Sequence, residues 1–176
     1  DVSVQKQVVE QFLMIREKFG TSILLVSHNI GVIRAMADEI LVLHQGKTVD
    51  YGKKDDILAQ PTSEYTEKLL EAVPRFRRST HGGETYRAVD DVSFSLGFHE
   101  KMAVIGESGS GKTTLARMIT RLTEATSGQI FLEEENITRA KGHNLRNIYQ
   151  KMQMVFQMPV DSFDSRRRLG DGIAES

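Results

Sequence analysis

The chain has 176 residues, of which 39% are hydrophobic and 27% charged, and its formal net charge is −1. This composition is typical of a globular protein and argues against a disordered chain or a fibrous repeat. The near-neutral charge makes nucleic acid an unexpected partner, because proteins that neutralise many phosphates are usually basic. No apolar run approaches the roughly 18 residues that span a bilayer, and the sequence has no Cys for disulfides or thiolate metal sites. We therefore expect a cytosolic protein without a membrane span of its own.

The ends of the sequence indicate that the chain is part of a longer protein. Asp1 stands where a Met is expected and leads directly into a helical pattern, and residues 171–176 stop at the start of another.

The first 74 residues predict helices and strands in alternation. The expected helices are one that carries Val8, Phe12 and Ile15 and stops at Gly20, one over 30–37, and one that carries Tyr65, Leu69 and Ala72 and ends at Pro74. The expected strands are 23–26 and 40–43, followed by an edge hairpin through Thr48 and Val49. Because 23–26 and 40–43 are continuous apolar runs, both are predicted to be buried on both faces.

A change in composition predicts two domains. Residues 75–85 are polar, basic and contain two glycines, which is typical of a linker between a domain over 1–74 and a domain over 86–176. The elements expected after the linker are strands over 89–96 and 101–105, a glycine-rich turn, a helix over 112–122, and strands over 129–132 and 152–156.

The strongest motif in the sequence follows the pattern G-x-x-x-x-G-K-[ST] of a phosphate-binding loop, or P-loop. Its residues, with the first helical residue after it, are Gly106, Glu107, Ser108, Gly109, Ser110, Gly111, Lys112, Thr113 and Thr114. Glycines let successive backbone N–H groups turn toward a phosphate, and the helix N-terminus adds a partial positive charge there. We expect Lys112 to reach the β- and γ-phosphates of ATP and the Thr113 hydroxyl to bind Mg²⁺. The alternative is an ordinary glycine-rich turn, which the strand and helix beside the motif make less attractive.

Sequence around the P-loop resembles the ATP-binding cassette (ABC) ATPases. The resemblance rests on Val92-Ser93-Phe94, on GESGSGKTT at 106–114 and on QMVFQ at 153–157. It implies an α/β fold with a P-loop NTPase core and both ATP and Mg²⁺ as ligands. It also implies that Gln157 is the Q-loop glutamine, which helps to hold Mg²⁺ and the attacking water. A glutamine that merely ends a strand is the alternative.

The beginning of the chain resembles a different part of the same family's domain. DVSVQ at 1–5 is similar to the stretch after the Walker B segment, which implies that Asp1 is the D-loop aspartate. LLVSH at 24–28 is similar to the switch-histidine strand, which implies that His28 contacts the γ-phosphate; a structural histidine is the alternative. The chain would then run from the end of one cassette into the start of a second, as two partial nucleotide-binding domains.

Residues 61–74, in an extension over about 53–74, resemble the C-terminal extension of oligopeptide, dipeptide and nickel importer ATPases. The match rests on Tyr65-Thr66 and on 69–74, whereas Ser63-Glu64 stands where that family has His-Pro. The resemblance implies a tandem double-cassette ATPase that energises import of peptides or related small solutes. Its partners would be transmembrane permease subunits, a paired ATPase cassette and, indirectly, a substrate-binding protein, at the cytoplasmic face of the inner membrane.

Other readings of these residues stay open. The segment over 61–74 can be an amphipathic capping helix, and the protein a soluble ABC ATPase or a non-catalytic nucleotide-binding module. The sequence contains neither an LSGGQ-type signature nor a Walker B segment, so we expect little ATP turnover from this chain alone. Tyr86 and Phe76 are both candidates for the aromatic residue that stacks on adenine. Residues 166–168, a run of arginines, are expected in a solvated turn.

In the resembled family the P-loop strand lies between the switch-histidine strand and the strand that follows it. We therefore expect 102–105 to lie between 23–26 and 40–43, which would bring His28 near Lys112. Without a Walker B strand, this half-core would expose apolar surface beside 23–26.

Overall fold

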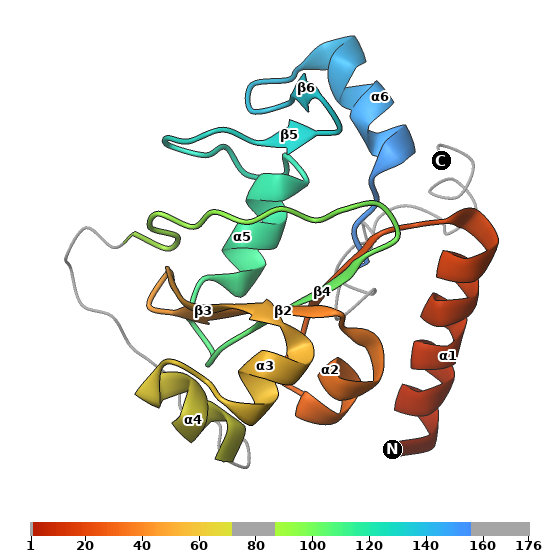
Figure 1. Cartoon of the computed structure of the whole chain (residues 1–176). Helices are drawn as coiled ribbons and strands as arrows, with labels where there is room; N and C mark the ends of the chain where they lie inside the picture. The colour runs from red at the N-terminus through yellow and green to blue at the C-terminus, as the bar shows by residue number, and fades with distance from the viewer. Residues whose placement is uncertain (1, 72–86, 156–176) are drawn as a thin grey trace, which may run out of the picture. The chain divides into compact units, whose positions relative to one another are not determined.

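The computed structural model describes residues 2–71 and 87–155. The chain divides into two compact units, Asp1–Ala116 and Arg117–Ser176, called here the first and the second unit. In the described ranges, no helix combines the length and the apolar character needed to cross a bilayer. The elements of both units are drawn in Figure 1.

A four-stranded sheet forms the centre of the first unit. The elements of this unit are α1 (Val2–Phe19), β1 (Ile23–Val26), α2 (Ile30–Met36), β2 (Glu39–His44), β3 (Lys47–Lys53), α3 (Lys54–Ala59), α4 (Glu64–Glu71), β4 (Lys101–Ile105) and the beginning of α5 (Lys112–Ile119). The strand order is β1-β4-β2-β3. β4 runs parallel to both of its neighbours, and β2 and β3 form an antiparallel pair.

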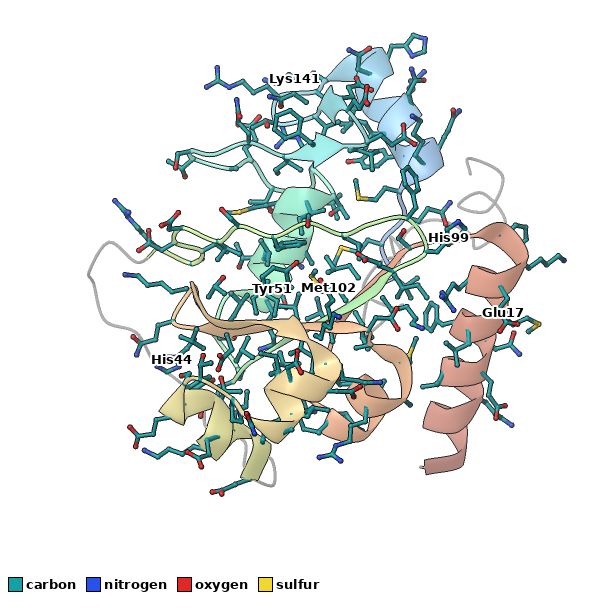
Figure 2. All side chains as sticks on the ribbon, in the orientation of Figure 1. Glu17, His44, Tyr51, His99, Met102 and Lys141 are labelled. Atoms are coloured by element: carbon teal, nitrogen blue, oxygen red, sulfur yellow. The ribbon has the colours of Figure 1, made fainter. Side chains whose placement is uncertain are left out.

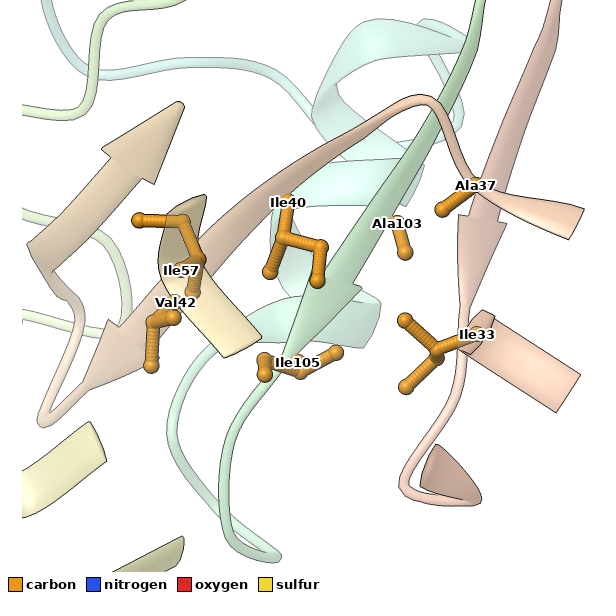
Figure 3. Close-up of a cluster of buried hydrophobic side chains, with 7 residues drawn as sticks. All are labelled: Ile33, Ala37, Ile40, Val42, Ile57, Ala103 and Ile105. Atoms are coloured by element: carbon orange, nitrogen blue, oxygen red, sulfur yellow. The ribbon is translucent and has the colours of Figure 1, made fainter. Parts of the chain in front are cut away.

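The sheet's hydrophobic core follows from the alternation of side chains along each strand. Successive residues of a strand point to opposite faces, so Ile40 and Val42 of β2 share a face with Ala103 and Ile105 of β4. α2 and α3 cover this face, and their residues complete one buried cluster (Figure 3). The members of the cluster are Ile33, Ala37, Ile40, Val42, Ile57, Ala103 and Ile105. The residues that alternate with them, Leu41, Leu43, Met102 and Val104, are all fully buried at 0% exposure.

The expected position of the P-loop strand is confirmed. β4 pairs with β1 on one side and with β2 on the other. The prediction that 23–26 is buried on both faces is wrong, because all four residues of β1 are only partly buried. β1 is the first strand in the sheet order and has β4 as its one strand neighbour among the described residues, which explains its incomplete burial.

Several elements begin or end where residues in the sequence favour a helix end or a turn. α1 ends at Phe19, and Gly20 adopts a φ of +65°, where glycine has no steric penalty. α2 begins after Asn29, whose side chain accepts hydrogen bonds from the backbone N–H groups of Gly31 and Val32. The hairpin through Lys47–Lys53 lies at the sheet edge, as predicted.

The second unit contains the end of α5 together with β5 (Phe131–Leu132), β6 (Glu135–Asn136) and α6 (Gly142–Lys151). β5 and β6 form an antiparallel pair of strands. Two isoleucines are almost fully buried in this unit, Ile137 at 0% and Ile148 at 2% exposure. Ile148 belongs to α6, a helix that was not predicted from the sequence because its remaining residues are mostly polar and exposed.

Some predicted elements are wrong or too long. Residues 89–96 and 152–155 form no strand, because neither segment pairs with another strand in the described part of the chain. The strand expected over 129–132 is reduced to Phe131–Leu132, and the helix expected over 112–122 ends at Ile119. The short helix α3 was not predicted.

Candidate functional site

The candidate site lies at one edge of the sheet in the first unit. Because β1, β2 and β4 are parallel to one another, their carboxyl ends meet at the same edge. Residues 27–29 follow β1, Gln45-Gly46 follows β2, and the P-loop follows β4. Ligands of open parallel sheets bind outside the carboxyl ends of the strands, where the order of strands changes direction. The P-loop therefore occupies the position at which such a sheet binds a ligand.

Two glycines of the loop are required by its close packing. Gly106 has a φ of +150°, and a Cβ there would lie 2.2 Å from the Leu43 carbonyl oxygen. Gly111 has a φ of +99°, and a Cβ there would lie 2.1 Å from the Ala88 carbonyl oxygen. Both distances are far below any van der Waals contact, so a side chain at residue 106 would displace the loop from β2, and one at residue 111 would displace it from Ala88.

The turn between β2 and β3 supports the loop from the side. The backbone N–H of Gly46 donates to the Ser110 carbonyl over 3.0 Å, and the Gly46 carbonyl accepts from the Asp90 N–H over 2.7 Å. The loop is thus hydrogen-bonded to a hairpin from the early part of the chain.

Lys112 folds back over the P-loop. Its Nζ donates to the carbonyl oxygens of Gly106 over 2.8 Å and Glu107 over 2.6 Å, and to the Ser110 Oγ over 3.2 Å. Burial lowers the pKa of Lys112, and the nearby Glu107 carboxylate partly opposes this effect. Three oxygens of the loop therefore hold the side-chain amine above the backbone that the motif predicts to bind phosphate.

The start of α5 provides further donors. The Leu115 N–H bonds to the Gly111 carbonyl over 2.8 Å, so the helix begins directly after the last loop glycine. The N–H groups of Lys112, Thr113 and Thr114 precede this first helical bond and have no carbonyl partner within the helix. Thr113 is exposed, and Thr114 is partly buried. Such a helix N-terminus, together with a lysine and a glycine-rich loop, fits an anionic phosphate group.

A tyrosine from α4 contacts the loop. The Tyr65 hydroxyl accepts a hydrogen bond from the Glu107 backbone N–H over 3.0 Å. The Tyr65 ring lies against the His44 ring, with centroids 3.9 Å apart and planes tilted by 41°, and Figure 2 shows His44 beside α4. Burial raises the pKa of Tyr65. The sequence pattern places Tyr65 on the apolar side of a helix and gives no sign of its contact with the loop.

Asp50 of β3 fixes the beginning of α4. Its carboxylate accepts hydrogen bonds from the hydroxyls of Thr62 and Thr66 and from the backbone N–H groups of Thr62 (3.2 Å) and Ser63 (3.1 Å). Burial acts to raise the pKa of Asp50, but these hydrogen bonds outweigh it and leave the pKa below its usual value. Asp50 was also missed, although the Thr-Ser-x-x-Thr pattern at 62–66 carries the hydroxyls that bind it.

His28 lies in the turn between β1 and α2 and is exposed. The backbone N–H of Ser27 donates to the Val104 carbonyl over 3.3 Å, which ties the start of this turn to the strand before the P-loop. The sheet thus brings His28 to the same edge as Lys112, although its contact with a phosphate stays a prediction.

Several predicted site residues lie outside the described part of the chain. These residues are Asp1, Phe76, Tyr86, Gln157 and the arginines at 166–168. The predicted linker over 75–85 also lies outside it, so the two-domain division stays a prediction.

Comparison with known proteins extends these observations. Residues 89–171 match the ABC transporter family. Over almost the whole chain, the sequence is similar to the glutathione import ATP-binding protein GsiA of Shigella dysenteriae serotype 1 (strain Sd197), with 27% identity over 227 aligned positions, 99% of this chain and 36% of the relative. GsiA of Escherichia coli (strain K12) is 26% identical over the same shares of the two chains.

The chain therefore spans about a third of the length of these curated relatives. Because the 227 aligned positions outnumber its 176 residues, the relatives also carry residues within the aligned stretch that this chain lacks. The family match includes β4, the P-loop and α5, which identifies the α/β fold as that of a P-loop NTPase. Residues 89–171 thus match the ABC transporter family, and the chain is similar along its length to glutathione import ATP-binding proteins.

Proposed function

We propose that the chain binds Mg-ATP through the P-loop over 106–113, as part of an ATPase that energises an ABC importer. The observation that carries the proposal is the loop itself, with its two obligatory glycines, the partly buried Lys112 and the N-terminus of α5. A glycine cradle next to a strand and a helix N-terminus fits a phosphate group. ATP would supply the phosphates, and the Mg²⁺ bound with it would neutralise part of their charge.

Each residue has a proposed role in binding. Lys112 would turn from the loop carbonyls toward the β- and γ-phosphates, and the exposed Thr113 hydroxyl would bind Mg²⁺. Backbone N–H groups from Gly111 to Thr114 would hold the remaining phosphate oxygens. His28 would contact the γ-phosphate from the end of β1, and Gln157 would complete the Mg²⁺ site.

Importer function is supported by the curated relatives, which are named as glutathione import proteins, and by the residues over 61–74. We propose a peptide or a related small solute as the transported class. The intact protein would dock on transmembrane permease subunits at the cytoplasmic face of the inner membrane. There, two cassettes would close on ATP and reopen after hydrolysis.

The chain alone is proposed to bind ATP without appreciable turnover. Its sequence contains no LSGGQ-type signature and no Walker B carboxylates to orient the attacking water. Positioning and charge stabilisation provide most of the catalysis of phosphoryl transfer, so loss of these groups removes most of the rate.

The importer assignment is tested by determining the coding sequence on both sides of residues 1–176. A signature and a Walker B segment before Asp1, and a second set after Ser176, are expected for a tandem importer ATPase. Uptake of labelled glutathione and dipeptides by cells that carry this gene, with and without Lys112→Ala, then tests transport. An intact gene whose Lys112→Ala form imports these solutes at the unchanged rate would overturn the importer proposal.

A further inference from the structure

We propose that Tyr65 is a positioning residue of the P-loop, which it orients by holding the Gly106–Glu107 peptide group. The inference rests on the proposed nucleotide binding and deepens it. Two ends of this one peptide group are engaged: the Gly106 carbonyl accepts from Lys112 Nζ over 2.8 Å, and the Glu107 N–H donates to the Tyr65 hydroxyl over 3.0 Å. In a trans peptide, the carbonyl and the N–H point in opposite directions. The peptide therefore lies between Tyr65 and Lys112 and connects them.

The backbone on its own restricts this peptide only weakly. Gly106 has a φ of +150°, a value that glycine reaches at no steric cost and other residues rarely adopt. Rotation of the peptide plane would turn the Gly106 carbonyl away from Lys112. The hydrogen bond from Glu107 to Tyr65 opposes that rotation, and it does so from outside the loop.

Tyr65 is suited to this role because it is itself well fixed. Its ring lies 3.9 Å, centroid to centroid, from the ring of His44 at the end of β2. Its backbone N–H donates to Ser63 Oγ over 3.2 Å, and the next residue, Thr66, is fully buried and bonded to Asp50. The hydroxyl is thus placed by a helix that is fastened to β3, so the position of α4 is transmitted to the loop.

The test uses Tyr65→Phe, which removes the hydroxyl and keeps the ring beside His44. Hydrogen exchange of the Glu107 amide, measured by NMR without nucleotide, is expected to become about three- to tenfold faster, as follows from loss of one hydrogen bond. The affinity for Mg-ATP is expected to fall by a similar factor, because the first peptide group of the loop would be less fixed in orientation before a phosphate binds. Tyr149→Phe is the matched control, because Tyr149 lies in α6 of the second unit and is 38% exposed.

The outcomes separate this inference from the function on which it rests. A Glu107 exchange rate that is the same in Tyr65→Phe and Tyr149→Phe would overturn the positioning role, whatever happens to ATP binding. Faster exchange with an unchanged ATP affinity would overturn the role of Tyr65 in nucleotide binding. Faster exchange in a chain that binds no ATP even in its wild-type form would support the orienting contact and refute the proposed function instead. Thermal unfolding of both variants near the wild-type midpoint confirms that the fold is retained.

Discussion

Leu25 of β1 and Ala103 of β4 face each other in a parallel pair of strands, although the predicted linker separates them in the sequence. Ala103 also lies opposite Ile40 of β2 on its other side. One sheet is thus assembled from three strands that precede residues 72–86 and one strand that follows them. The P-loop depends on this arrangement, because β4 has no other strand neighbours among the described residues.

Hydrogen exchange tests the sheet directly. We expect the amides of β4 to be the slowest to exchange, because this strand is hydrogen-bonded on both sides and Met102, Ala103 and Val104 are fully buried. The amides of β1 should exchange faster than those of β2, because β1 is an edge strand and only partly buried. Equal and rapid exchange in β1, β2 and β4 would refute the sheet.

Substitutions at Gly109 and Gly111 of the P-loop distinguish the cost of a steric clash from the cost of backbone strain. Gly109 has a φ of +84° with open space around a would-be Cβ, whereas Gly111 combines a φ of +99° with a Cβ position 2.1 Å from the Ala88 carbonyl. Gly109→Ala is expected to lower the free energy of unfolding by about 1–2 kcal/mol, the strain of a left-handed residue. Gly111→Ala should lower it by clearly more, as measured by urea denaturation. Equal losses would mean that residue 88 does not approach the loop.

Asp50 is expected to make the free energy of unfolding depend on pH in the acid range. Its pKa is lowered in the folded chain, because hydrogen bonds from Thr62, Ser63 and Thr66 outweigh the effect of burial. The unfolded chain therefore binds a proton at a higher pH than the folded chain, so the stabilisation is complete above the ordinary aspartate pKa. It is lost as the pH falls from that value through the lower pKa of the folded state.

Asp50→Asn measures this contribution. We expect the free energy of unfolding at pH 7 to fall by about 1–3 kcal/mol, the range for buried hydrogen bonds to a charged group. The decline of stability below pH 4 should also become shallower. Asp55→Asn, at an exposed position of α3, controls for the loss of one negative charge. If the stability of the wild type and of Asp50→Asn declined identically below pH 4, the lowered pKa of Asp50 would be contradicted.

The proposed Mg²⁺ contact of Thr113 predicts a change in metal dependence. Thr113→Ala should bind ATP in EDTA about as well as the wild type but lose most of the gain in affinity that Mg²⁺ provides. The readout is a titration with a fluorescent ATP analogue with and without Mg²⁺. Thr126→Ala, at an exposed position of the second unit, is the control. An undiminished Mg²⁺ effect in Thr113→Ala would remove this hydroxyl from the proposed site.

The sequence was most informative where apolar pattern and turn chemistry agreed. Short apolar strands, the stop at Gly20 and the P-loop between a strand and a helix could all be predicted from local signals. The position of β4 between β1 and β2 followed from the family resemblance alone. No local pattern in the sequence determines which strands pair across so many residues.

Contacts between distant polar groups could not be predicted. The bond from Glu107 to Tyr65, and the cluster of donors around Asp50, join residues whose proximity depends on how α4 packs against the sheet. For residues 89–96, in contrast, the sequence predicts an element that the structure does not contain. Their alternating pattern predicts a strand, but a strand also needs a partner, and the described residues provide none there.

The central claim is that this chain forms a working phosphate-binding loop, and a Mg-ATP titration beside Lys112→Ala tests it most directly. Phosphate release is followed in the same samples. We predict saturable binding by the wild-type chain, loss of most of that binding in Lys112→Ala, and no phosphate release above background from either. Equal binding by both chains, or binding by neither, would contradict the claim.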